Sequence, residues 1–181
     1  MRWDRLFDDL VAQLEAEEAR ELDAEVADRT RRERALVGLH ERLSAAVGGA
    51  PVTLRVAGVG QVRGVVTGVG ADWVLVQERA DRPALVAMAA VRSITGLVGA
   101  VPTGAVAKAF ALGAALRALS RDRAAVEVVD IDGSVLGGTI DAVGQDGFDL
   151  AEHPVDLPRR TENVIATRTV PFHALSLVRR R

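Results

Sequence analysis

An internal repeat is the feature that most constrains how this chain of 181 residues can fold. When the sequence is shifted by 74 positions, Val62–Asp72 (VRGVVTGVGAD) aligns with Leu136–Asp146 (LGGTIDAVGQD). Farther along, Val86–Arg92 resembles Val170–Ser176 at a shift of 84, so the second copy carries a ten-residue insertion that falls within His153–Arg168. A repeated segment of this length is expected to form the same unit of structure twice.

Each copy has the pattern of five short strands. Val52, Leu54 and Val56 alternate with polar residues, as expected of a strand with one buried face. Gly64 and Gly138 take the same mid-strand position in the two copies, where a residue without Cβ permits a sharp bend and a close backbone approach. The Asp-Gly pair at 132–133 is typical of a hairpin turn. The predicted strands are Val52–Val56, Val62–Val66, Val74–Val76, Ala84–Met88 and Val91–Ile94, then Val126–Asp130, Val135–Ile140, Gly147–Leu150, Arg168–Phe172 and Ala174–Val178.

Residues 1–48 predict an acidic helical arm, because they hold 12 acidic and 8 basic side chains and are rich in good helix formers. Apolar residues recur at helical spacing near the start, become sparse over residues 15–34, and resume at Leu36. Two alternatives remain open. The arm is either one long helix that dimerises as a coiled coil, or two helices that separate near residues 28–30.

A second helix is predicted between the two copies. It starts after Thr103 as the N-cap and runs to about Leu119. Its buried side is expected to carry Val106, Phe110, Leu116 and Leu119. The glycine-rich stretch just before it lacks the Lys-Ser or Lys-Thr pair of a phosphate-binding loop, so it is interpreted as a linker.

A helix followed by five strongly bent strands resembles the Sm-like fold, a small SH3-type barrel. The resemblance rests on the Asp-Gly turn (Gly58 in the first copy), the mid-strand glycines, and the closing segments Val86–Ile94 and Val170–Val178. It implies a mainly β fold of two tandem five-stranded barrels, each preceded by a helix. The expected parts are the arm (1–48), the first barrel (49–98), a linker and helix (99–120) and the second barrel (121–181). The whole chain also resembles a family of uncharacterised proteins from GC-rich bacteria.

The composition argues against an enzyme. The chain has no Cys, its three His have no metal-ligand spacing, and no nucleophile–base arrangement is recognisable. We therefore predict no enzymatic activity, no metal site and no cofactor; the acid pairs 130/132 and 146/149 are interpreted as turn residues. There is no signal-peptide pattern and no apolar run long enough to span a membrane, so a cytoplasmic location without membrane contact is expected. His153 and His173 are interpreted as a loop residue and a strand residue.

Arginine clusters are the remaining candidates for a binding site. The net charge is −2 overall, but residues 49–181 hold 13 acidic and 15 basic side chains. Two function hypotheses follow: a module that binds RNA through arginines that grip phosphates, or an interaction scaffold that oligomerises through the helical arm and exposed strand edges. Trp73 is a candidate partner-binding side chain or a packed one. The candidate nucleic-acid-binding residues are Arg159, Arg160, Arg168, Arg179, Arg180 and Arg181 in the second copy, and Arg55, Arg63 and Arg92 in the first.

The pore that holds uridines in Sm-like RNA binders does not carry over. Those proteins resemble one another in an Asn after the third-strand Asp and in an Arg-Gly or Lys-His pair near the fifth strand. Here the corresponding residues are Asp72-Trp-Val-Leu-Val and Asp146-Gly-Phe-Asp-Leu, with no Asn. The fifth-strand region also has no Arg-Gly. Any RNA contact is therefore expected to use the arginine clusters instead.

Overall fold

The computed structural model describes residues 17, 20–32, 35–79, 82–97, 110–154, 156, 157 and 159–180. The chain divides into two units, Met1–Gly38 and Leu39–Arg181. In the first unit, residues 20–32 form a helix that continues through positions 28–30, so the predicted separation there is wrong. Val37 and Gly38 are not helical, so a single unbroken helix to Val47 is also wrong.

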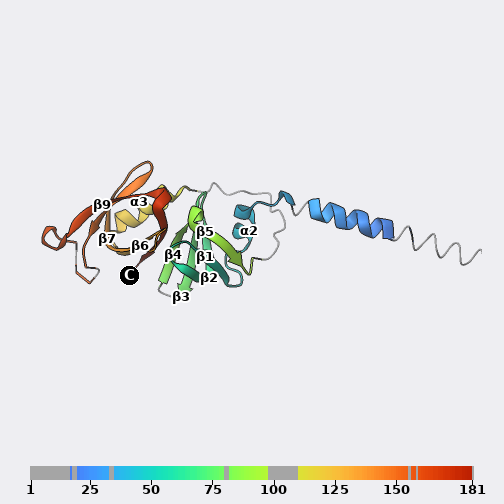
Figure 1. Cartoon of the computed structure of the whole chain (residues 1–181), viewed down its shortest axis with the longest axis horizontal. Coiled ribbons are helices and arrows are strands. Elements are labelled where there is room, and N and C mark those ends of the chain that lie inside the picture. Colours follow the sequence, from blue (N-terminus) through green and yellow to red (C-terminus); the bar gives the residue numbers. More distant parts are fainter. Residues whose placement is uncertain are drawn as a thin grey trace, which may run out of the picture. The chain divides into compact units, whose positions relative to one another are not determined.

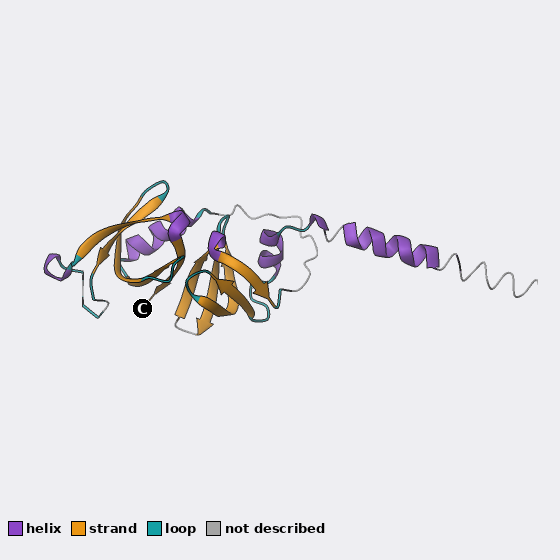
Figure 2. Cartoon of the chain, viewed as in Figure 1, coloured by secondary structure: helices purple, strands orange, loops and turns teal. Residues whose placement is uncertain are grey.

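The second unit repeats one order of elements twice, as the sequence repeat predicts (Figures 1 and 2). In each half a helix precedes four strands, and a 3-10 turn then leads into a fifth strand. The first half comprises α2 (Leu39–Ala45), β1 (Val52–Val56), β2 (Gly60–Val69), β3 (Trp73–Arg79), β4 (Arg82–Ala87), η1 (Met88–Ala90) and β5 (Val91–Thr95). The second comprises α3 (Leu112–Asp122), β6 (Ala125–Asp130), β7 (Val135–Val143), β8 (Gly147–Glu152), β9 (Ala166–Pro171), η3 (Phe172–Ala174) and β10 (Leu175–Arg180), with the turn η2 (Thr161–Asn163) inside the insertion.

The expectation of two tandem five-stranded barrels is wrong. The ten strands of the described residues belong to one antiparallel sheet, in the order β5-β1-β2-β3-β4-β10-β6-β7-β8-β9. The sheet passes from one half to the other where β10 pairs with β4, with Leu177 opposite Val86 and Val178 opposite Leu85. Apolar residues from both halves form one buried cluster. The β4–β10 pair, called the seam below, is what turns two repeats into one sheet.

The mid-strand glycines have the role that the sequence predicts. A Cβ on Gly64 would lie 2.2 Å from the carbonyl oxygen of Gln77, and a Cβ on Gly138 would lie 2.1 Å from that of Ala151. Both distances are far below van der Waals contact, so only glycine allows the neighbouring strand to approach this closely. The bulges that follow are also equivalent, at residues 66–68 of β2 and 140–142 of β7. The two halves therefore bend at the same place for the same reason.

Helix α3 begins later than the sequence predicts. Its first backbone N–H, on Leu112, donates to the carboxylate of Asp72 at 2.6 Å, and Ala111 supplies no side-chain cap. Phe110 precedes the helix and is 71% exposed, so its predicted burial is wrong, whereas Leu116 is buried as predicted. Leu119 packs half-buried against the core. The expected N-cap Thr103 and the expected core residue Val106 lie outside the described residues.

Candidate nucleic-acid interface

The outward side of β5, β1 and β2 gathers three of the predicted arginines. Alternation along β1 and β2 buries every second residue and leaves Arg55 and Arg63 exposed. In the register, Arg55 faces Gln61, which places Arg63 diagonally opposite it, a spacing of about 7–8 Å for such neighbours. Arg92 is exposed at the irregularity where β5 pairs with β1. We call this surface, with Arg55, Arg63 and Arg92, the arginine face.

No carboxylate balances the arginine face from its own strands. The sequences of β1 (VTLRV), β2 (GQVRGVVTGV) and β5 (VRSIT) contain neither Asp nor Glu. Among the described residues, none of the three arginines takes part in an ion pair. Their neighbours include the half-buried Thr53 and the exposed Gln61 and Ser93, which are uncharged hydrogen-bonding groups. The face therefore presents three unneutralised guanidinium groups in a polar setting.

The predicted arginines of the second half are arranged differently, because each described one lies beside a carboxylate. Arg159 makes a two-pronged contact with Asp141 on β7, at 2.6 and 2.5 Å, and this hydrogen bonding raises the pKa of Arg159. The other pairs are Arg168 with Glu152 at 2.5 Å, Arg180 with Asp122 at 3.7 Å, and Arg160 with Glu162 at 3.9 Å. Arg181 lies outside the described residues. These pairs lower the net positive charge available to an anionic polymer on that half.

Arg179 has a structural position between the two halves. It extends from β10 to Glu78 on β3, with Nε 2.8 Å from Oε2 and Nη2 3.1 Å from Oε1. Its Nη1 also lies 3.6 Å from a carboxylate oxygen of Glu127 on β6. The three side chains are only 11–17% exposed. This arrangement joins both repeats across the seam and leaves Arg179 little surface for a ligand.

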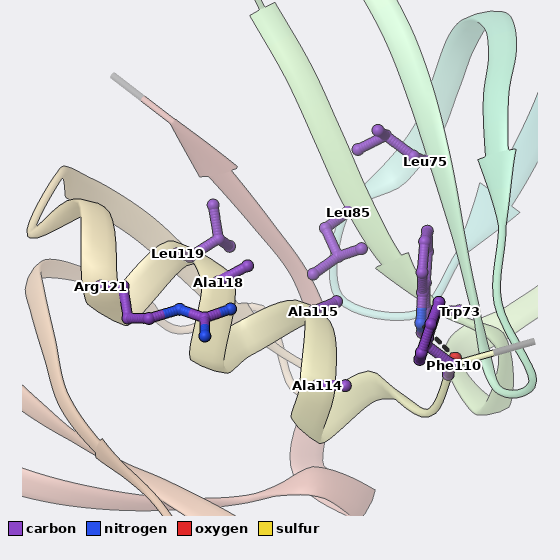
Figure 3. A pocket seen from close by; sticks show the side chains of 9 residues that line it. All are labelled: Trp73, Leu75, Leu85, Phe110, Ala114, Ala115, Ala118, Leu119 and Arg121. Atoms are coloured by element: carbon purple, nitrogen blue, oxygen red, sulfur yellow. Dashed lines mark hydrogen bonds between the residues drawn. The ribbon is translucent and has the colours of Figure 1, made fainter.

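Trp73 packs rather than standing free. Its indole Nε1 donates to the carbonyl oxygen of Phe110 at 2.8 Å (Figure 3). A Cβ on Gly70 would lie 2.1 Å from the indole ring, so Gly70 leaves the space that the ring fills. Trp73 also lines an apolar groove of about 480 Å³, which runs between β3, β4 and α3 and has Arg121 near one end. The side chain is half-buried, and a partner-binding role for it stays a prediction.

The sequence analysis missed a buried polar pair at the start of the insertion. His153 is a loop residue after β8, as predicted, but it is only 2% exposed. Its Nε2 lies 2.9 Å from the hydroxyl of Thr139, itself 2% exposed. The other ring nitrogen, Nδ1, lies 2.8 Å from the carbonyl oxygen of Pro154. A carbonyl only accepts, so Nδ1 carries a proton, and in the neutral ring the Thr139 hydroxyl donates to Nε2. The pair fixes where the insertion leaves β8.

His173 was predicted to lie in a strand. It is instead an exposed residue of the turn η3. Among the described residues, no group of three His, Asp or Glu side chains could hold a metal ion. No helix in the described part of the chain is long and apolar enough to cross a membrane.

Comparison with protein-family models, with curated proteins and with solved structures finds no match to this chain.

Proposed function

We propose that the chain is a non-enzymatic nucleic-acid-associated module that contacts RNA through the arginine face. The observation that supports this most is the charge segregation on β5, β1 and β2, which carry three exposed arginines and no acidic residue. Every described arginine among the other candidates has a carboxylate within 4.0 Å. Among the described candidate arginines, the three on this face are therefore the ones that an anionic polymer would meet without a neighbouring carboxylate.

Phosphate contacts suit the chemistry of this face better than base stacking does. A guanidinium group offers planar, paired donors that match phosphate oxygens. Aromatic side chains, by contrast, are few, with two Trp, four Phe and no Tyr in the whole sequence. The described Trp is held half-buried by its hydrogen bond to Phe110. We therefore expect contacts to the sugar–phosphate backbone, with weak sequence preference and strong salt dependence.

A second candidate function, oligomerisation through the helical arm, rests on the helix of residues 20–32. Leu22 and Val26 lie four residues apart on it and are 62% and 58% exposed. An isolated helix of this length is marginally stable in water, so an apolar stripe on it is more stable against a partner. This candidate predicts that removing residues 1–34 lowers the oligomeric state in solution. It does not predict any effect of the three arginines on RNA binding.

The proposal is tested by measuring the affinity for a fluorescently labelled single-stranded RNA over a range of salt concentrations. The variant Arg55→Ser/Arg63→Ser/Arg92→Ser removes the three phosphate contacts without introducing a charge. On single strands each contact contributes about 0.7 to the slope of log affinity against log salt, so the slope should fall by about 2. Between about 50 and 200 mM salt, the factor by which the affinity falls should therefore be roughly 20-fold smaller for the variant than for the wild type.

A matched control separates the arginine face from net charge alone. The variant Arg160→Ser/Arg168→Ser/Arg180→Ser removes the same number of charges from exposed arginines that lie beside carboxylates. We expect it to retain most of the wild-type slope. Equal slopes in the two triple variants, or RNA binding by neither the variants nor the wild type, would overturn the proposal. A single-stranded DNA of the same sequence shows whether the 2′-hydroxyl contributes.

A further inference from the structure

The second half contains a polar pocket of about 360 Å³ outside the arginine face. It lies where the end of α3, the bulge of β7 and the insertion come together. Three of its lining residues are arginines and one is an acid. The lining residues are Ser120, Arg121, Arg123, Thr139, Ile140, Asp141 and Arg159.

The repeat shows that this pocket is an addition to the second half. Asp141 occupies the bulge of β7, and the residue at the equivalent bulge of β2 is Thr67, which has no charge. Arg159 belongs to the ten-residue insertion and has no counterpart in the first half. The two-pronged contact between Arg159 and Asp141 holds the insertion against β7. The first half therefore lacks both of the residues that close this side of the pocket.

The backbone at Arg123 also distinguishes the second half. Arg123 follows α3 with a φ of 48°, and it is the one non-glycine residue with a positive φ in the described part of the chain. The turn after α2 also contains a left-handed residue, Gly48 with a φ of 70°, which lies three residues beyond the end of that helix. Glycine adopts this left-handed conformation at the lowest cost, and residues held there against that preference cluster at functional sites. An arginine at this position costs backbone energy and places a guanidinium group at the pocket.

The charges of the lining residues favour an anion. Arg121 and Arg123 form no ion pair among the described residues, and Asp141 is already engaged by Arg159. The lining therefore has an excess of positive charge, from Arg123 and from Arg121, whose side chain also lines the apolar groove. The Ser120 hydroxyl can donate, whereas the Thr139 hydroxyl already donates to His153 when that ring is neutral. Arginine groups arranged with a hydroxyl are typical of phosphate recognition.

We propose that this pocket binds a phosphate monoester of a small organic molecule. A monoester carries close to two negative charges at neutral pH, which is opposite in sign to the excess of the lining. A pocket of about 360 Å³ has room for an organic group beside the phosphate, and Ile140 gives part of the wall an apolar surface. Free mononucleotides and the 5′-phosphate end of an RNA chain share this chemistry. The inference uses residues outside the arginine face and does not depend on the proposed function.

The test compares adenosine 5′-monophosphate with adenosine by isothermal titration calorimetry on the full-length chain. We expect the monophosphate to bind and adenosine not to bind. Arg123→Gly is the decisive variant, because glycine suits the backbone conformation and the fold should remain intact. It should weaken binding of the monophosphate about tenfold or more, since one charge-assisted contact is lost.

Arg168→Gln serves as the control, because Arg168 pairs with Glu152 on β8 and does not line the pocket. It should bind the monophosphate as the wild type does. Absence of monophosphate binding, or equal binding by wild type and Arg123→Gly, would overturn the inference. Two RNAs of one sequence, with a 5′-phosphate or a 5′-hydroxyl, identify the source of the ligand. If the wild type prefers the RNA with the 5′-phosphate and Arg123→Gly does not, the pocket binds RNA ends. If the wild type binds the monophosphate but shows no preference between the two RNAs, the pocket binds free nucleotides.

Discussion

Arg179 should contribute more to the stability of the fold than any other arginine among the candidate binding residues. Its guanidinium group contacts Glu78 on β3 and Glu127 on β6, so it joins the two halves of the sheet. The side chains of Arg179, Glu78 and Glu127 are 14%, 17% and 11% exposed. Replacing Arg179 with Met keeps most of the side-chain volume but leaves two nearly buried carboxylates without their shared counter-charge.

The expected cost follows from that burial. Removing one partner of a buried ion pair typically costs about 3–5 kcal/mol, because the other charge stays buried without compensation. The carboxylates here keep some contact with water, so we expect the lower end, about 3 kcal/mol for Arg179→Met. For a chain of this size each kcal/mol corresponds to roughly 2–4 °C, so the melting temperature should fall by about 6–12 °C.

Urea denaturation followed by circular dichroism measures this directly. Arg180→Met is the matched control, because Arg180 is the next residue of β10 and its 3.7 Å contact with Asp122 joins side chains that are 57% and 63% exposed. An exposed pair of that kind contributes about 0–1 kcal/mol. Further substitution of Glu78 by Gln should restore part of the stability lost in Arg179→Met, since it removes a nearly buried carboxylate that has lost its counter-charge. Equal denaturation midpoints for the two Met variants would refute the reasoning.

Two further predictions concern local geometry. Gly138→Ala should destabilise the chain by about 3 kcal/mol in the same assay, because the new Cβ would lie 2.1 Å from a backbone oxygen that cannot rotate away. Gly68→Ala, with its nearest contact at 3.7 Å, should be nearly neutral, and an equal loss in both would contradict the steric explanation. Burial acts to raise the pKa of Asp130, but hydrogen bonds from Ser134, Asp132 and Gly133 outweigh it and leave the pKa below its usual value. Asp130→Asn should therefore lose about 1 kcal/mol at neutral pH, and the difference from wild type should shrink as pH falls below about 4; a pH-independent difference would contradict it.

The repeat predicted the local structure well because its signals are local. Alternation of apolar residues and the position of Gly64 and Gly138 depend only on neighbouring residues, and strands form in all ten predicted segments. The start of α3 could not be predicted in the same way. Its cap is the carboxylate of Asp72, 40 residues upstream, which approaches Leu112 only in the folded chain. The predicted N-cap was chosen from nearby residues alone.

The same limit applies to the arginines of the candidate interface. The sequence identified nine of them without showing which would be neutralised. Arg179 and Glu78 are 101 residues apart, and Arg159 and Asp141 are 18 apart across the insertion. The arginine face differs because its strands contain no acid, a property that is visible in the sequence once the strand order is known. The three-dimensional arrangement of the strands and the insertion was the missing information for these arginines.

Comparison with the seam also explains why β5 is an edge strand of the sheet, with no partner on its outer side among the described strands. At the shift of 84 residues that relates the ends of the two copies, β10 corresponds to β5 and β4 corresponds to β9. The seam is apolar and buried, with Leu85 and Val86 facing Val178 and Leu177. The outer edges carry polar residues instead, with Ser93 where β10 has Leu177.

Under the proposed function, the difference between the exposed edge strand β5 and the buried strand β10 matters most at Arg92. Its counterpart in β10 is Ser176, which is fully buried and donates to the carbonyl oxygen of Ala57. A strand that paired with β5 as β4 pairs with β10 would bring the guanidinium group of Arg92 into a buried position, at a high cost in desolvation. Charged residues on edge strands oppose strand addition for this reason. Arg92 thus disfavours a scaffold built by pairing on β5, and the same exposed position keeps it available to phosphates on the arginine face.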